Sequence, residues 1–358
     1  MEDAKDVEDV EDAEESKESE DNTMTKIYLQ NGTLAETFSP DTESMFYIRL
    51  DEFDGIRLLR HTADSLNPMV YDALTDLSEL FTSRMFGNKM EYELRVPFLP
   101  PWTYGAGLYS DLSMSASSME KEVSKIKDPV LYKALYLHDC HFLGEIVQNL
   151  SSSMEKAFVN YYIKLSGFQD QYGELRVVND DGDLSVVAIA SEESREISTL
   201  IETYFLKAYS ILDTMSKICY EFQFMDPDMR GDITEYKGLK SAGISFADRS
   251  KLSLNGAEGT LFEDCELIQM IQTIRNEMIH TGVLEFCPNV FLKRRKKVPI
   301  ERYMLFPDMK QGHLDQCMNR NHFYSERVKI NDTLPGIHKE FQARLFITAD
   351  RLKKEYKK

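Results

Sequence analysis

The sequence predicts a mostly α-helical protein, with a helical bundle in its C-terminal half and an α-rich N-terminal domain that carries a small β element. Apolar residues recur at spacings of three and four along several long stretches, which is typical of amphipathic helices. One stretch near residues 171–190 alternates around an Asp-Gly pair, which is typical of a β-hairpin. With 358 residues, 42% of them hydrophobic, the chain can bury a large core and has the length of about two domains.

Three parts are expected along the chain: an acidic tail over residues 1–22, an uncharacterised α-rich domain over 23–189 that ends with the hairpin, and a helical domain over 190–358. Residues 1–22 hold twelve Asp/Glu against two Lys, a net charge of −10. Like charges repel and almost nothing apolar is present there, so we expect a disordered tail, or one that competes with nucleic acid for the basic end. Residues 283–358 hold seventeen Lys/Arg against nine Asp/Glu, a net charge of +8 in a chain of −19.

In the N-terminal part, residues 24–60 contain short extended pieces and residues 66–90 are expected to be helical. Pro and Gly then interrupt regular structure over 97–107. Asp128 followed by Pro129 predicts a helix start, and the helix is expected to continue to about residue 165. Its expected buried face consists of residues at spacings of three and four: Leu131, Leu135, His138, Phe142, Ile146 and Leu150. The hairpin near 171–190 would then close this domain.

Three helices are expected in the C-terminal part. The first opens with a Ser and two acids near residue 191 and buries one stripe of residues: Ile197, Ile201, Tyr204, Ala208, Ile211, Met215, Ile218 and Phe222. After a loop over 226–259, Thr260 and Glu263 match a capping box, which predicts a second helix from about Leu261 to a stop at Gly282. The last helix buries Phe341, Leu345, Leu352 and Tyr356 and ends in lysines.

The second of these helices carries the candidate site. One of its sides is apolar (Leu267, Ile271, Ile274, Met278) and another is polar (Gln269, Thr273, Asn276, His280). Arg275 lies beside this polar side, and Asn276 and His280 are one turn apart. A polar side on a surface helix is ordinary, so spacing alone does not establish a function.

The run Arg275, Asn276, Glu277, Met278, Ile279, His280, together with the long helix that precedes it, resembles the motif of the HEPN superfamily. The resemblance covers roughly residues 190–358 and implies an all-α bundle. It also implies a metal-independent ribonuclease of the kind used in toxin and antiphage defence, with no cofactor. His280 would then act as general acid or base, because histidine titrates close to neutral pH. Arg275 would stabilise charge on the phosphate, and Asn276 would orient His280 or bind phosphate. The alternative is a non-catalytic HEPN-like module that binds RNA, a nucleotide or a protein.

The expected partner is RNA, and a regulatory partner such as an antitoxin would fit the family role. A second basic feature supports RNA: Lys293, Arg294, Arg295, Lys296 and Lys297 are consecutive and would attract a phosphate backbone, although a solvated surface loop or a localisation-like tract explains them equally well. Five steps along a helix rotate a side chain by about 140°, so Arg275 and His280 do not share a face. A homodimer with a composite site would bring them together, as is common among HEPN domains.

Several other classes of site are not indicated. Five cysteines without a C-x-x-C pair predict reduced thiols. Residues 226–237 imitate a calcium loop but place Arg230 and Lys237 where oxygen ligands are required. The pair His138 and His141 is read as core histidine, so no metal site is expected. The acidic N-terminus and the absence of a run of about 18 apolar residues predict a cytoplasmic protein with no membrane segment.

Overall fold

The computed structural model describes residues 25–28, 34–38, 47–51, 55–59, 66–95, 97, 114–169, 174–180, 182–225 and 237–357. The acidic tail lies outside these residues, and so does most of the 226–237 segment that resembles a calcium loop. The chain is mostly helical, as predicted, with short antiparallel sheets. None of the helices in the described ranges is long and apolar enough to cross a membrane.

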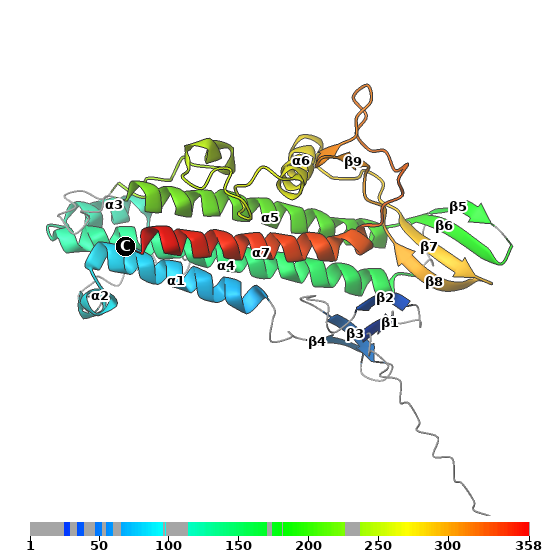
Figure 1. Ribbon diagram of the computed structural model, residues 1–358, viewed down its shortest axis with the longest axis horizontal. Helices are drawn as coiled ribbons and strands as arrows, with labels where there is room; N and C mark the ends of the chain where they lie inside the picture. Colours follow the sequence, from blue (N-terminus) through cyan, green and yellow to red (C-terminus); the bar gives the residue numbers. More distant parts are fainter. Residues whose placement is uncertain are drawn as a thin grey trace, which may run out of the picture.

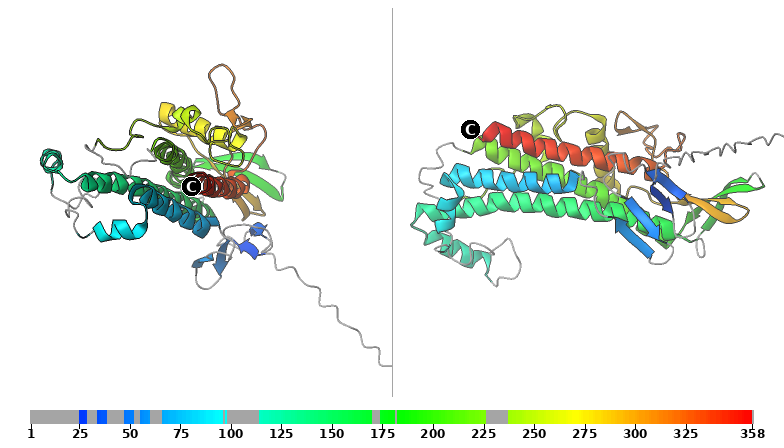
Figure 2. Two further views of the ribbon diagram at one scale, coloured as in Figure 1. Left: turned by 60° about the vertical axis from the view of Figure 1, so that its left-hand side comes forward. Right: turned by 60° about the horizontal axis from the view of Figure 1, so that its bottom comes forward.

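Four long helices lie side by side as a bundle (Figures 1 and 2). They are α1 (Leu66–Phe86), α4 (Pro129–Gly167), α5 (Glu192–Phe224) and α7 (Ile330–Tyr356), and the shorter α2 (Lys89–Arg95) and α3 (Ala116–Ser124) follow α1. Asp128 caps α4 by accepting from the Val130 amide, and Ser191 caps α5 through a reciprocal box with Ser194. The sequence predicted these starts because the capping residues are local to the helices that they begin.

The predicted stripe of α5 is confirmed, since all eight of its residues are buried. The predicted face of α4 is wrong by about a quarter turn. Leu135 of that face is buried, but His138, Phe142 and Leu150 are only half-buried. The fully buried positions are instead Leu137, Cys140, Val147, Met154, Phe158, Tyr161 and Leu165. The helix packs against both α1 and α5, so two neighbours determine its buried side and periodicity alone does not.

A four-stranded antiparallel sheet projects from one end of the bundle (Figure 1). Its order is β5 (Glu174–Asp180), β6 (Leu184–Ala190), β7 (Val290–Arg295) and β8 (Val298–Tyr303). The predicted hairpin is therefore present as β5 and β6, and β6 pairs with β7 from residue Leu184 opposite Arg295 to Ile189 opposite Val290. The predicted domain boundary at residue 189/190 falls within this shared sheet and within the bundle, because α4 packs along α5.

Two further hairpins precede α1, in the stretch predicted to be extended. They are formed by β1 (Thr25–Tyr28) with β2 (Leu34–Phe38), and by β3 (Tyr47–Asp51) with β4 (Gly55–Leu59).

The helix that carries the candidate site, α6 (Glu266–Thr281), ends at Gly282 as predicted, in the left-handed conformation that favours glycine (φ 88°). Its predicted start at Leu261 is wrong, because the proposed capping box is used elsewhere. Glu263 accepts from the Gly259 amide and pairs with Arg344 of α7 at 2.6 Å. Residues 260–263 form a turn flanked by bends, and a 3-10 helix, η3 (Phe246–Lys251), lies in the preceding loop.

Candidate functional site

Helix α6 lies on the outside of the bundle against α5 (Figure 1). Its predicted apolar stripe, Leu267, Ile271, Ile274 and Met278, is buried. A short hairpin, β9 (Met309–Lys310) and β10 (His313–Leu314), packs against the same helix. The polar residues of α6 are therefore displayed between α5 on one flank and the 309–324 segment on the other.

Arg275 is held on the α5 flank. Its guanidinium lies over the ring of Tyr209 in α5, with 4.5 Å from Cζ to the ring centroid, and its Nη1 donates to Oδ1 of Asn276 at 3.0 Å. Burial raises the pKa of Tyr209, with a further contribution from Asp213, while Arg275 and Arg249 act in the opposite direction. These contacts hold the half-buried Arg275 side chain in one orientation and leave its other N–H groups available to an anion.

His280 is exposed in the last turn of α6, away from Arg275. No hydrogen bond or ion pair joins its ring to another residue of the described ranges. The expected contact between Asn276 and His280 is likewise not formed among them, and the Asn276 amide oxygen accepts from Arg275 instead. The structure therefore brings Arg275 and Asn276 together and leaves His280 separate.

Two histidines that the sequence analysis did not single out lie beside the face that carries His280. Positions 273, 277 and 280 fall on one side of a helix. The Thr273 hydroxyl is 3.3 Å from His313 Nδ1, and Glu277 Oε1 is 3.6 Å from His322 Nε2. Neither histidine has a local sequence signal, since each reaches α6 from the β9–β10 segment or the residues that follow it.

His322 belongs to a cluster of titratable groups. Its Nδ1 lies 3.5 Å from Oε2 of Glu285, which also accepts the hydroxyl hydrogen of Tyr324. Asn321 Nδ2 donates to the second oxygen of Glu277 at 2.8 Å. The hydrogen bond with Glu285 raises the pKa of His322, and the same bond lowers the pKa of Glu285. These carboxylates favour a positively charged His322 and fasten the 321–324 segment to the end of α6.

The predicted basic run is not a loop. Lys293, Arg294 and Arg295 belong to β7, and Lys296 and Lys297 form its turn into β8 with positive φ angles of 49° and 70°. Lys293 lies 3.8 Å from Glu301, whereas Arg295, Lys296 and Lys297 are exposed. This turn is at the end of the sheet that points away from the bundle, whereas α6 lies along the bundle (Figure 1).

The described residues contain no cluster of three or more His, Cys, Asp or Glu arranged to hold a metal ion. The His138 ring instead meets the Tyr92 hydroxyl at 2.8 Å, and His141 Nε2 meets the Thr82 hydroxyl at 3.0 Å.

Comparison with models of protein families, with curated proteins and with solved structures finds no match to this chain. The HEPN resemblance therefore rests on the residues of α6 and on the helix α5 that precedes it.

Proposed function

We propose that the chain is a metal-independent endoribonuclease of HEPN type, with a role in toxin action or antiphage defence. The observation that carries the proposal is the environment of the motif. Arg275 is oriented by Tyr209 and Asn276, while His280 stands exposed on the same helix. An oriented cation and an accessible imidazole are the two groups that phosphodiester cleavage through the 2′-hydroxyl requires.

In this reaction the 2′-oxygen forms a bond to phosphorus and the bond to the 5′-oxygen breaks. The products are a 2′,3′-cyclic phosphate and a 5′-hydroxyl. One histidine accepts the proton of the 2′-hydroxyl, and a protonated group delivers a proton to the leaving 5′-oxygen. Arg275 stabilises the charge that develops on the non-bridging phosphate oxygens through forked hydrogen bonds.

The proposal requires a second copy of the chain. Arg275 is held against α5, and His280 lies about 140° further round α6, so one copy does not direct both side chains at one phosphate. A two-fold pairing of α6 helices would direct Arg275 of one copy and His280 of the other into one cleft.

The first test is incubation of the purified chain with single-stranded RNA, with and without a chelator. We expect cleavage in both cases, with cyclic phosphate and 5′-hydroxyl ends. Cleavage that a chelator abolishes and a divalent ion restores would contradict the proposal.

The residues are tested by Arg275→Ala, Arg275→Lys and His280→Ala. Each should reduce cleavage by roughly a hundredfold or more, as removal of a group that stabilises the transition state does in other enzymes. Arg249→Ala is the matched control for arginine, since Arg249 also lies over an aromatic ring, at 4.7 Å from Phe246. His313→Ala is the control for an exposed histidine beside α6. Full activity of any of the three motif variants would refute the assignment.

The composite site is tested by mixing inactive Arg275→Ala and His280→Ala proteins under conditions that allow subunits to exchange. Mixed dimers should regain part of the activity, because one of their two sites keeps both groups. Full activity of the wild type at concentrations where light scattering detects only monomer would contradict the dimer.

One observation favours the alternative, a non-catalytic module that binds RNA, a nucleotide or a protein. Arg275 and His280 diverge within a single copy, so a chain that remains monomeric would retain an anion-binding arginine without a converging base. RNA binding without cleavage, weakened by Arg275→Ala but not by His280→Ala, would support this alternative.

A further inference from the structure

A hollow lies where the first turns of α5 cross the four-stranded sheet, separate from the motif on α6. One row of residues runs across the sheet in the order Arg176, Ala188, Phe291, Tyr303, each directly opposite the next. Residues opposite one another in antiparallel strands point to the same face. Ala188 is the small member of this row, and Ser198 on α5 is also small, so side chains do not fill the space between the helix and the sheet.

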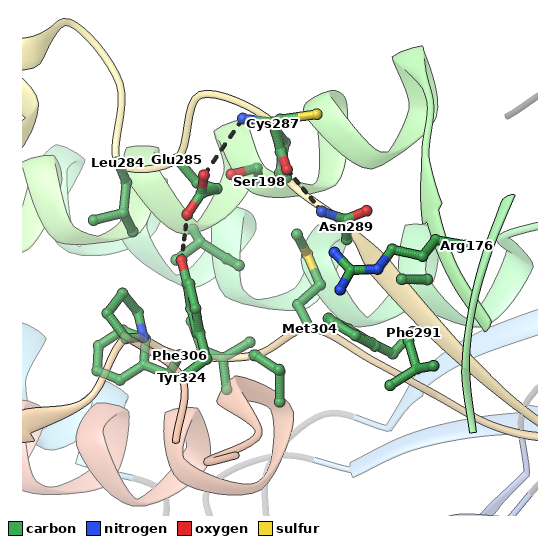
Figure 3. A pocket seen from close by; sticks show the side chains of 17 residues that line it. Arg176, Ser198, Leu284, Glu285, Cys287, Asn289, Phe291, Met304, Phe306 and Tyr324 are labelled. Atoms are coloured by element: carbon green, nitrogen blue, oxygen red, sulfur yellow. Dashed lines mark hydrogen bonds between the residues drawn. The ribbon is translucent and has the colours of Figure 1, made fainter. Parts of the chain in front are cut away.

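The hollow is a pocket of about 460 Å³ (Figure 3). Its walls are completed by the residues on either side of β7 and β8, including Leu284, Met304 and Phe306, and by Tyr324. Most of this lining is apolar or aromatic. A volume in this range, with an apolar lining and a few polar groups, is typical of sites for small organic molecules.

The charged side chains of the pocket differ in whether they have hydrogen-bond or ion-pair partners. Glu285 accepts from Tyr324 and from the Cys287 amide, and its charge is balanced by His322. Arg176 is the one cation among the lining residues that the structure describes, and no hydrogen bond or ion pair joins its guanidinium to the described parts of the chain. Figure 3 shows this guanidinium turned toward the pocket and well apart from Glu285.

From this arrangement we infer that the pocket binds a small organic anion, with a flat apolar body between the sheet and α5 and a carboxylate or phosphate group on Arg176. The apolar body follows from the lining of Ala188, Phe291 and Met304, from which water is displaced on binding. The anionic group follows from the Arg176 guanidinium, which has no hydrogen-bond or ion-pair partner among the described residues and whose planar set of donors matches a carboxylate or a phosphate. This inference does not depend on the proposed ribonuclease activity.

The direct test is isothermal titration of the full chain with four probes: 2-naphthoate, its neutral amide 2-naphthamide, 1-naphthyl phosphate and inorganic phosphate. We expect 2-naphthoate or 1-naphthyl phosphate to bind at least about tenfold more tightly than the amide, as loss of one charge-assisted hydrogen bond predicts. The better of these two identifies the anionic group. Inorganic phosphate should bind more weakly than either, because it has no apolar body.

Arg176→Gln should weaken binding of the best anionic probe by about tenfold and leave the affinity for the amide unchanged. Arg195→Gln is the matched control, because Arg195 is an exposed arginine at the start of α5 that does not line the pocket. Ala188→Leu should weaken binding of the anionic and the neutral probes alike, because the larger side chain fills the hollow. The inference is wrong if no probe binds at millimolar concentration, or if Arg176→Gln and Arg195→Gln have equal effects.

The chain also contains an internal reporter for the location of binding. Cys287 and Cys317 are both exposed, but only Cys287 lines the pocket. Alkylation by iodoacetamide, followed for each thiol by peptide mass spectrometry, should slow several-fold at Cys287 and stay constant at Cys317 when the best anionic probe is present. Equal protection of both thiols, or protection of neither by a saturating probe, would place binding elsewhere and overturn the assignment.

Discussion

Gly312 allows the β9–β10 turn to pack directly against the first turn of α6, and its replacement by Ala tests that packing. A Cβ atom at this position would lie 2.5 Å from the Glu266 carbonyl oxygen, 2.7 Å from Gln269 Cβ and 2.9 Å from the Met270 amide nitrogen. Two of these neighbours are helix backbone, which cannot rotate away. Gly312 also has a φ of 78°, a conformation that costs other residues free energy.

The magnitude follows from two separate contributions. The left-handed conformation costs an alanine about 1 kcal/mol. Overpacking against rigid neighbours adds about 2 kcal/mol, so Gly312→Ala should lower the free energy of unfolding by about 3 kcal/mol. Gly256→Ala isolates the first contribution, because Gly256 has a φ of 72° and a Cβ atom added there would meet nothing within 4 Å. That control should lose only about 1 kcal/mol.

The assay is urea denaturation of both variants, with hydrogen exchange of the α6 amides as a second measurement. We expect faster exchange in the first turn of α6 in Gly312→Ala alone, since the turn must lift away from the helix. Equal losses of stability in the two variants, within about 0.5 kcal/mol, would show that the turn does not pack against α6 in this way.

Three further predictions concern buried polar groups and the basic turn. Burial lowers the pKa of His338 to about 3, so the unfolded chain takes up a proton below about pH 6.5 that the folded chain does not. Stability is therefore full above that pH and falls as the pH decreases. Between pH 7 and 5 the wild type should lose about 2 kcal/mol more than His338→Phe, and equal losses in denaturation curves would contradict this. Tyr204→Phe should be neutral or stabilising by up to about 1 kcal/mol, because the buried Tyr204 hydroxyl has no hydrogen-bond partner among the described residues. A clear loss of thermal stability would show that the hydroxyl is satisfied. Replacing Arg295, Lys296 and Lys297 by Gln should reduce the salt dependence of RNA binding, measured by filter binding, without lowering the cleavage rate at saturating RNA. An unchanged salt slope would assign the turn to another role.

Local sequence patterns determined the long helices of this protein and several of their ends. The stripe of α5 is recoverable because its residues recur with the helix period over 26 positions, from Ile197 to Phe222, and all are buried. Three helix ends can be predicted from the sequence, because a capping residue contacts only the turn next to it. They are the starts at Asp128 and Ser191 and the stop at Gly282. The same locality made the β5–β6 hairpin predictable from the Asp-Gly pair in its sequence.

Tertiary structure alone decided which partners these elements meet. Glu263 pairs with Arg344, 81 residues away, so it does not cap α6. The strand β6 pairs with β7 about 100 residues later, which places the basic residues on a strand end, and no local pattern encodes that pairing. Within α6 the sequence nominates Arg275 and His280 as candidates for the site. Three other features depend on contacts between distant segments, which arise only when the bundle and the sheet are assembled. They are the packing of Arg275 on the ring of Tyr209, the pairing of His322 with two carboxylates, and the hollow beside Ala188.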